Sequence, residues 1–224
     1  FITNPNNPTG RVINKRLLKG IVDIANDYKL YIVSDEVFRG VEFSGEITPS
    51  IVEMYDIEKA VAISGLSKVY GLPGIRIGWT VSSVDLANKI WELKDYTTIT
   101  VSTISSYIAE HVLSSNLKYK LIERAKSIVR NNLSLLMETI KNHNDTFKII
   151  KPEGGTIALI KILNCNSTLE YAEKLFNERR LLIIPGETFN IPGYFRIGLG
   201  VKPNVLNRGL SVLLDFFRRE GIFS

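Results

Sequence analysis

The stretch Ser64–Trp79, SGLSKVYGLPGIRIGW, follows directly on the apolar run KAVAI at positions 59–63. Because that run has the pattern of a short buried strand, Lys68 stands among small polar residues just past the end of a strand. An amine at such a place is costly to desolvate unless its charge is paired or its nitrogen takes part in chemistry. The stretch therefore raises the question of what Lys68 does.

Two readings of this stretch follow from its residue types. The hydroxyls of Ser64 and Ser67 and the guanidinium of Arg76 together suit a phosphate group, and a partly desolvated Lys68 beside them could act as a nucleophilic amine. The alternative is a surface loop whose cations are merely solvated. The Ser-x-x-Lys pattern of acyl-enzyme hydrolases fails, because Gly65 occupies the serine position.

Around this stretch, the first half of the chain alternates short apolar runs with amphipathic stretches. This alternation predicts an α/β layer with mostly parallel strands. The expected strands are 30–34, 60–64 and 75–81, and the expected helices are 15–27, 85–94 and 104–113.

The second half has a different organisation. A long helical pattern over about 116–142 is followed by strand-like pieces mixed with helices at 168–179 and 204–219, which indicates a smaller α+β domain. We expect a first domain at 1–130, ending in the long helix, and a second at 131–224.

Composition narrows the possible functions. The chain of 224 residues is 45% hydrophobic and 23% charged, with a net charge of +5. The positive charge is scattered along helical stretches, which favours solvated helix faces and a small anionic partner over nucleic acid. No run is long and apolar enough for a membrane span. The single cysteine, Cys165, fits a reducing, cytoplasmic setting, and the two histidines stand without companions at zinc-ligand spacing.

Two further polar clusters follow apolar runs. The motif NPNNPTG at 4–10 predicts a tight loop, and a cis bond at Asn7–Pro8 would aim the Asn7 side chain. In YIVSDEVFRG at 31–40, Asp35 stands at the carboxyl end of a strand, where ligands bind in open α/β sheets. The plainer alternative is that Asp35 caps the following turn.

A third polar residue lies in an apolar strand near the end of the chain. In YFRIGLG at 194–200, Arg196 requires an anionic partner, because an unpaired guanidinium is unfavourable in apolar surroundings. That partner is a substrate or cofactor anion, or else an acidic side chain of the protein.

The order of these motifs resembles the class I aminotransferases, which are pyridoxal-phosphate enzymes of fold type I. The resemblance covers essentially the whole chain: NPNNPTG, then SDEVF, then SGLSKVYGLPGIRIGW, then FRIGLG. It implies part of a large cofactor-binding domain with a mostly parallel sheet, plus a smaller α+β domain. It also implies a homodimer, with amino acids and 2-oxo acids as substrates.

The resemblance implies a role for each matching residue. Lys68 corresponds to the lysine that forms the internal aldimine with pyridoxal 5'-phosphate and shuttles the proton between Cα and C4′. Asp35 corresponds to the partner of the ring nitrogen, and Asn7 to the asparagine that hydrogen-bonds the 3′ oxygen. Arg76 and Ser67 correspond to ligands of the cofactor phosphate, and Arg196 to the arginine that binds the substrate carboxylate.

Two positions depart from the family pattern. Phe38 stands at a cofactor-binding position where many members carry a tyrosine that also bonds the 3′ oxygen, so we expect a less finely tuned cofactor. Gly65 stands where many members carry a phosphate-binding serine, and Ser64 or Ser67 could take its place. Family members are also considerably longer before NPNNPTG, so we expect this chain to be a fragment that is inactive unless completed.

Three functions stay open at this stage. The first is an aminotransferase, the second a β-lyase or decarboxylase on the same scaffold, and the third a non-catalytic binding or assembly domain. The segment KDYTTITVSTISS at 94–106 contains no arginine, which disfavours a dicarboxylic substrate.

Overall fold

The structure of the protein is a computed structural model that describes residues 1–222. The chain divides into two compact units. The first unit contains Phe1–Asn7, Arg11–Ala125 and Glu153–Gly155. The second contains Pro8–Gly10, Lys126–Pro152 and the residues from Thr156 onward. The division thus falls at Ala125, inside the long helix, whereas the sequence pattern places it at residue 130.

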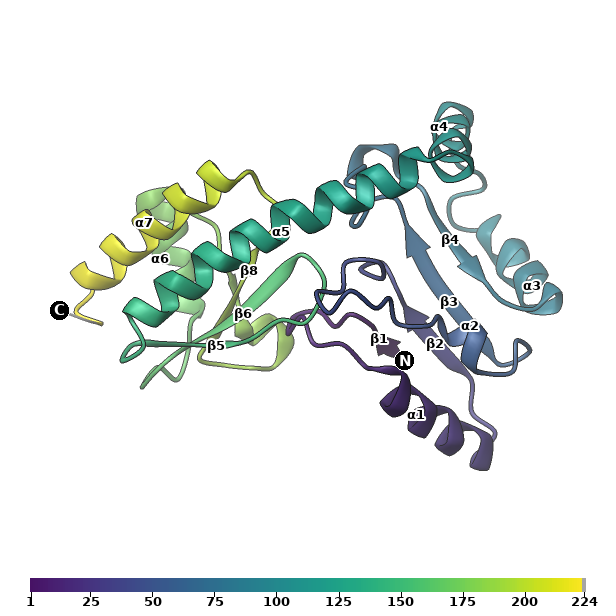
Figure 1. The fold of residues 1–224 in the computed structure, drawn as a ribbon, viewed down its shortest axis with the longest axis horizontal. Coiled ribbons are helices and arrows are strands. Elements are labelled where there is room, and N and C mark those ends of the chain that lie inside the picture. Colours follow the sequence, from purple (N-terminus) through teal and green to yellow (C-terminus); the bar gives the residue numbers. More distant parts are fainter. Residues whose placement is uncertain (223–224) are drawn as a thin grey trace. The chain divides into compact units, whose positions relative to one another are not determined.

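The first unit is built on a four-stranded sheet (Figure 1). Its strands lie in the order β1 (Ile2–Thr3), β2 (Ile32–Asp35), β3 (Ala60–Gly65), β4 (Gly78–Val81). The pairs β1–β2 and β2–β3 are parallel and β3–β4 is antiparallel. Its helices are α1 (Lys15–Asp27), α2 (Ile51–Met54), the 3-10 turn η1 (Pro73–Ile75), α3 (Val84–Lys94) and α4 (Thr103–Ser114).

The core of this sheet comes from α1 and the strands. Leu18, Val22 and Ala25 recur on one face of α1 at helical spacing and pack with apolar residues of β2 and β3. The helix begins where the Asn14 side chain accepts a hydrogen bond from the Leu17 N–H. Burial of this face fixes the strands whose carboxyl ends carry the polar motifs.

Two expected strands begin later than the sequence indicates, and the first of them, expected at 30–34, is β2, which starts at Ile32. The pattern predicts a strand at 75–81, but β4 starts at Gly78 because Pro73–Ile75 forms a 3-10 turn. Arg76 then adopts a left-handed conformation with φ of 57°. The cis peptide bond also differs from expectation, since it lies at Asn4–Pro5 and not at Asn7–Pro8.

The second unit has its own four-stranded sheet, which is antiparallel throughout. The strand order is β5 (Phe147–Ile150), β6 (Ile157–Ile162), β8 (Tyr194–Gly198), β7 (Ile184–Pro185). Its helices are α6 (Leu169–Arg179), the 3-10 turn η2 (Gly186–Phe189) and α7 (Pro203–Arg219), and α5 (Leu117–Asn142) enters it from the first unit.

An aromatic cluster holds α7 to this sheet. The ring of Phe217 lies 5.5 Å from that of Phe147 on β5 and 6.3 Å from that of Phe195 on β8, centroid to centroid. All three rings are buried. Large aromatic side chains supply much of the apolar area of a small domain, so this cluster fixes the position of β8.

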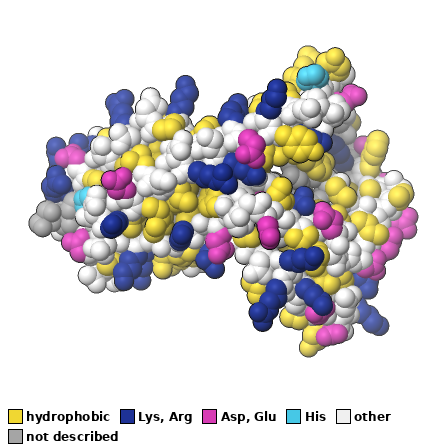
Figure 2. Space-filling view, viewed as in Figure 1, with side chains coloured by type: hydrophobic (Ala, Val, Ile, Leu, Met, Phe, Trp, Pro, Cys, Tyr) yellow, Lys and Arg dark blue, Asp and Glu magenta, His cyan; other side chains and the backbone are white. Residues whose placement is uncertain are grey.

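The visible face of the molecule carries its positive charge in a dispersed form (Figure 2). On the face shown in Figure 2, lysine and arginine side chains lie in separate small groups with acidic side chains among them. Among the described residues, no helix combines the length and apolar character that crossing a membrane requires.

Candidate active site

Three polar motifs leave the first sheet at one edge. Because β1, β2 and β3 are parallel, their carboxyl ends lie side by side, with Asp35 paired to Thr3 on one side and Ile63 on the other. The Asn4 N–H donates to the Asp35 carbonyl at 2.9 Å, and the Glu36 N–H donates to that of Ile63 at 2.8 Å. This edge is where open α/β sheets bind ligands.

A pocket of about 420 Å³ lies just past the end of β3. Ser64, Ser67, Lys68 and Arg76 supply its polar side chains. The remaining described lining residues are Val37, Gly65, Pro73, Ile77 and Gly78, so the described lining contains no carboxylate. Two hydroxyls and two cations give the pocket the chemistry of an anion site.

The backbone around Arg76 shapes this pocket. Arg76 directly follows η1 and adopts the left-handed region, which is unfavourable for a residue with a Cβ. Its Nη1 donates to the Pro73 carbonyl at 3.1 Å, which ties the side chain back to the turn. Lys68 is exposed on the pocket wall, so the desolvation expected from its sequence context is not seen among the described residues.

Asp35 caps the turn after β2, which is one of the two roles that its position in the sequence suggests. Its Oδ1 accepts a hydrogen bond from the Val37 N–H at 3.0 Å, which closes the turn after β2. The side chain is half-buried. Asp35 therefore stabilises the turn that carries Val37 to the pocket, and this contact is compatible with a second role toward a ligand.

Asn7 and Phe38 belong to the same unit but do not line the described pocket. Asn7 is exposed in the loop after β1, and Phe38 is buried in the segment after β2. A Cβ built on Gly155 would lie 3.4 Å from Cγ of Phe38, so the backbone of that glycine packs against the ring.

Arg196 lies in the second unit, on β8, paired with Leu159 of β6 and Ile184 of β7. It is half-buried, and burial lowers the pKa of its guanidinium. The Cζ atom stands 5.2 Å from the centroid of the Phe189 ring, within the range of a cation–π contact.

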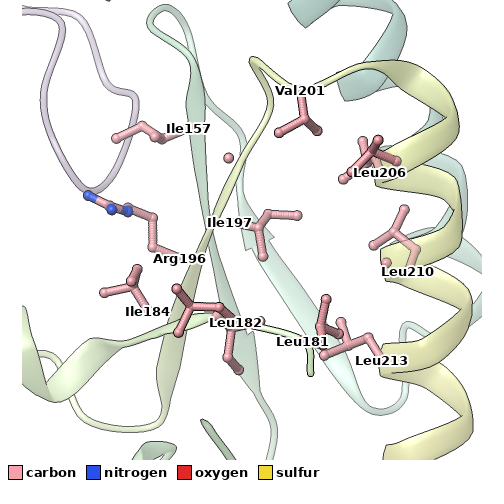
Figure 3. Close-up of a pocket in the computed structure, with 14 residues that line it drawn as sticks. Ile157, Leu181, Leu182, Ile184, Arg196, Ile197, Val201, Leu206, Leu210 and Leu213 are labelled. Atoms are coloured by element: carbon pink, nitrogen blue, oxygen red, sulfur yellow. The ribbon is translucent and has the colours of Figure 1, made fainter. Parts of the chain in front are cut away.

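Arg196 also borders an apolar pocket of about 280 Å³ within the second unit. Figure 3 shows Ile197, Leu206 and Leu210 directed into the space between β8 and α7, whereas the guanidinium of Arg196 points away from them. This difference follows from the alternation of side chains along a strand.

Two residues with contacts near the candidate side chains were missed by sequence reasoning. Phe189 stacks on Arg196, and only its place in the PGETF turn before β8 could have drawn attention to it. Glu153 contacts Val12, two residues after the NPNNPTG motif, from 141 positions further along the chain, and no local pattern signals such a pairing.

Comparison with known proteins agrees with the resemblance of the motifs. The family model described as aminotransferase class I and II matches residues 1–213. An aspartate aminotransferase from Thermotoga maritima is 27% identical over 216 residues, which are 96% of this chain and 55% of that protein. A probable aspartate aminotransferase from Methanocaldococcus jannaschii is 29% identical, over 97% of this chain and 58% of that protein. The chain thus spans about half the length of the curated relatives it matches.

Solved structures confirm the predicted α/β fold. A pyridoxal-phosphate-dependent aminotransferase from Streptococcus suis superposes with a TM-score of 0.89 at 34% identity, covering 97% of this chain and 56% of that one. The aspartate aminotransferase structure from Thermotoga maritima gives a TM-score of 0.83 at 27% identity, over 97% and 56% of the two chains. The chain therefore belongs to the class I and II aminotransferase family.

Proposed function

We propose that the whole protein containing this chain is a pyridoxal-phosphate-dependent aminotransferase that moves an amino group between an amino acid and a 2-oxo acid. The observation that carries the proposal is the pocket past β3, which Lys68 lines together with Ser64, Ser67 and Arg76. In a member of this family, such a lysine beside an anion site has the chemistry of a covalent cofactor anchor.

The residues present fit the cofactor. Its phosphate carries close to two negative charges, which the two cations and two hydroxyls of the pocket can neutralise and hydrogen-bond. Ser64 and Ser67 both line the pocket, so either hydroxyl can replace the serine that many relatives carry at the position of Gly65. Lys68 Nζ would hold the cofactor covalently, with Arg76 binding its phosphate.

When bound, pyridoxal phosphate supplies a ring that withdraws electrons from the substrate Cα. Once the substrate amine has taken its place on the cofactor, the freed Lys68 Nζ would accept the proton from the substrate Cα and deliver it to C4′ of the cofactor. The Asp35 carboxylate would hold a proton on the ring nitrogen through its negative charge. The planar fork of Arg196 would bind the substrate carboxylate through two parallel hydrogen bonds and so orient the Cα–H bond.

Asn7 and Phe38 complete the proposed cofactor set. The Asn7 amide would donate to the 3′ oxygen of the ring, as the resemblance implies. Phe38 has no hydroxyl that could donate to the same oxygen, so this hydrogen bond would depend on Asn7. The buried ring of Phe38 packs against Gly155 and supports the backbone after β2.

Two observations bear on which substrate side chain the protein accepts. The relatives from Thermotoga maritima and Methanocaldococcus jannaschii are named aspartate and probable aspartate aminotransferases. The 94–106 segment of this chain contains no arginine that could bind a second carboxylate. The first observation favours a dicarboxylic amino acid and the second disfavours it. The substrate class proposed is therefore an amino acid with a 2-oxo acid, and both dicarboxylic and neutral amino acids are to be assayed.

We further propose that the protein is a homodimer and works in the cytoplasm. The homodimer is supported by the motif order shared with the class I aminotransferases. The cytoplasmic setting is supported by the single cysteine, Cys165, which leaves this chain without an internal disulfide. Sedimentation of the whole protein tests the first point, and fractionation of cells tests the second.

The test is a half-reaction. The whole protein is loaded with pyridoxal phosphate and mixed with single amino acids in the absence of a 2-oxo acid. An aminotransferase converts the cofactor to pyridoxamine phosphate stoichiometrically and releases the matching 2-oxo acid. Release of ammonia or carbon dioxide without that conversion would instead identify a β-lyase or a decarboxylase. A protein that takes up no cofactor would be a binding or assembly module.

A further inference from the structure

The loop that carries Asn7 is closed by hydrogen bonds at its base. Asn4 is buried, and its Oδ1 accepts from the Ile13 N–H at 2.8 Å while its Nδ2 donates to the Ile13 carbonyl at 3.1 Å. Further along the loop, the Asn6 N–H donates to the Arg11 carbonyl at 2.8 Å. These bonds hold the two arms of the loop together, with Asn7 directly after the last of them.

Glu153 adds a charged contact from a distant part of the chain. Its Oε2 accepts a hydrogen bond from the Val12 N–H at 2.9 Å, and its Oε1 lies 3.0 Å from Nη1 of Arg11. Glu153 lies between β5 and β6, yet it clusters with the first unit. Hydrogen bonds to an ionised acceptor are shorter and stronger than neutral ones, so this contact restrains the returning arm of the loop.

The two residues after Glu153 fit closely against the same unit. A Cβ on Gly154 would lie 3.0 Å from Cγ of Pro5 and 3.1 Å from both Cγ2 of Val12 and the Val41 carbonyl. Gly155 has φ of +80°, and its N–H donates to the Val41 carbonyl at 2.9 Å. Glycine at 154 therefore permits a close approach that a side chain would prevent.

The 153–155 segment also joins the segment after β2. The Phe43 N–H donates to the Glu153 carbonyl at 2.8 Å, and Glu42 pairs with Gly154 in an isolated β-bridge. Gly155 lies against the Phe38 ring. One short segment thus contacts the loop of Asn7 on one side and the segment of Phe38 on the other.

We propose that Glu153 is a positioning residue for Asn7. Through Val12 and Arg11 it fixes the returning arm of the loop, and the close packing of Gly154 on Pro5 and Val12 prevents the loop from shifting. The backbone that carries Asn7 is thereby restrained, which would limit the positions open to its amide. The link to the cofactor rests on the proposed function, whereas the restraint of the loop rests on the contacts alone.

The first test needs no cofactor. Amide hydrogen exchange at Val12 is compared in the wild-type protein, Glu153→Ala, Glu153→Gln and the control Glu170→Ala, which removes an exposed ion pair with Lys174 on α6. We expect exchange at Val12 to accelerate about tenfold or more in Glu153→Ala, as the usual strength of a bond to a charged acceptor implies. Glu153→Gln retains an acceptor, so its exchange rate at Val12 should stay closer to that of the wild type. The control Glu170→Ala should exchange at the wild-type rate. Unchanged exchange at Val12 in Glu153→Ala overturns the proposal.

The second test asks whether Glu153 acts through Asn7. The pH midpoint of the absorbance change of bound pyridoxal phosphate is measured in the whole protein. Loss of a donor to the 3′ oxygen disfavours its anion, so Asn7→Ala should raise the midpoint and Glu153→Ala should raise it by a smaller amount. The double variant should match Asn7→Ala, because the two changes share one contact. Additive shifts, or an unchanged midpoint in Glu153→Ala, contradict the positioning role.

These tests separate two failures. If the wild-type protein takes up no pyridoxal phosphate, the proposed function fails, and hydrogen exchange at Val12 alone decides whether Glu153 restrains the loop. A lower melting temperature in Glu153→Ala with no shift in the midpoint would show a purely structural contact and reject the role toward Asn7.

Discussion

At the scale of single residues, Arg196 combines partial burial with an aromatic neighbour. Burial lowers the pKa of its guanidinium, but an arginine remains charged at any physiological pH. The Phe189 ring, 5.2 Å away, covers the group without using its in-plane N–H donors. If Arg196 binds the substrate carboxylate as proposed, this contact would orient its guanidinium before the substrate arrives.

Replacing Phe189 by leucine should therefore weaken substrate binding. A cation–π contact contributes about 1 kcal/mol, so KM for the amino acid should rise roughly fivefold in Phe189→Leu while kcat changes little. Phe189→Tyr keeps an aromatic face and should restore KM. Steady-state kinetics of the whole protein measure both constants. An unchanged KM in Phe189→Leu, or a fall in kcat alone, would count against this role.

Glu42 gives the stability a dependence on pH. It is buried, and its desolvation raises its pKa above 4.5 even though the Gly40 and Thr48 N–H groups donate to it. A raised pKa in the folded state means that folding favours the protonated carboxyl. The contribution of Glu42 to stability is then greatest at low pH and declines as pH rises through the range above 4.5.

The matched comparison is with Glu42→Gln, which does not titrate. Urea unfolding of both proteins between pH 4 and pH 7 gives the difference in their free energies of unfolding. We expect the wild type to lose stability relative to Glu42→Gln as pH rises. A difference that grows in favour of the wild type, or stays constant, contradicts a raised pKa.

At the scale of elements, β3 and β4 approach each other too closely for a side chain at one position. Gly65 pairs with Gly78, and a Cβ on Gly65 would lie 3.0 Å from the Ile77 carbonyl and 3.2 Å from Cα of Gly78. A side chain at 65 would therefore require the two strands to move apart by a few tenths of an ångström.

Gly65→Ser should consequently destabilise the protein by about 1–3 kcal/mol, because the strands must separate to admit the side chain. The control is Gly74→Ser in η1, where an added Cβ meets nothing within 4 Å. That variant should stay within about 0.5 kcal/mol of wild type. Thermal unfolding of the two variants measures the contrast, and equal stability would show that the strands adjust without cost.

Elements that are specified locally could be predicted from the sequence. Helix α1 has the predicted bounds because Asn14 caps it and three apolar residues recur on one face. Strand β4 was predicted three residues too early, because the apolar alternation of Ile75 and Ile77 continues through a turn that Pro73 imposes. Periodicity alone does not distinguish these two conformations.

The candidate site likewise contains features that could be predicted from the sequence and features that could not. Ser64, Ser67, Lys68 and Arg76 lie within one stretch, so their convergence on one pocket could be expected from spacing. The contact of Glu153 with Val12 depends on the path of the chain through β5 and back, and no local pattern contains it. The exposure of Lys68 was one of two possibilities that the sequence left open, because burial depends on the whole surrounding structure.

At the scale of the whole molecule, the proposed roles fall in both compact units. The residues proposed for the cofactor lie in the first, and the arginine proposed for the substrate carboxylate lies in the second. The chain spans about half the length of its relatives, so its activity is to be measured in the whole protein. The proposed chemistry depends on one atom of this molecule, Nζ of Lys68.

The most direct measurement is covalent trapping. The whole protein is mixed with pyridoxal phosphate, reduced with borohydride, digested and analysed by mass spectrometry. We expect a phosphopyridoxyl group on Lys68 in close to one copy per chain, and its loss in Lys68→Arg, which keeps the positive charge of the pocket but cannot form the bond. Equal labelling of Lys68→Arg and the wild type, or labelling of other lysines with Lys68 unmodified, would show that Lys68 does not anchor the cofactor.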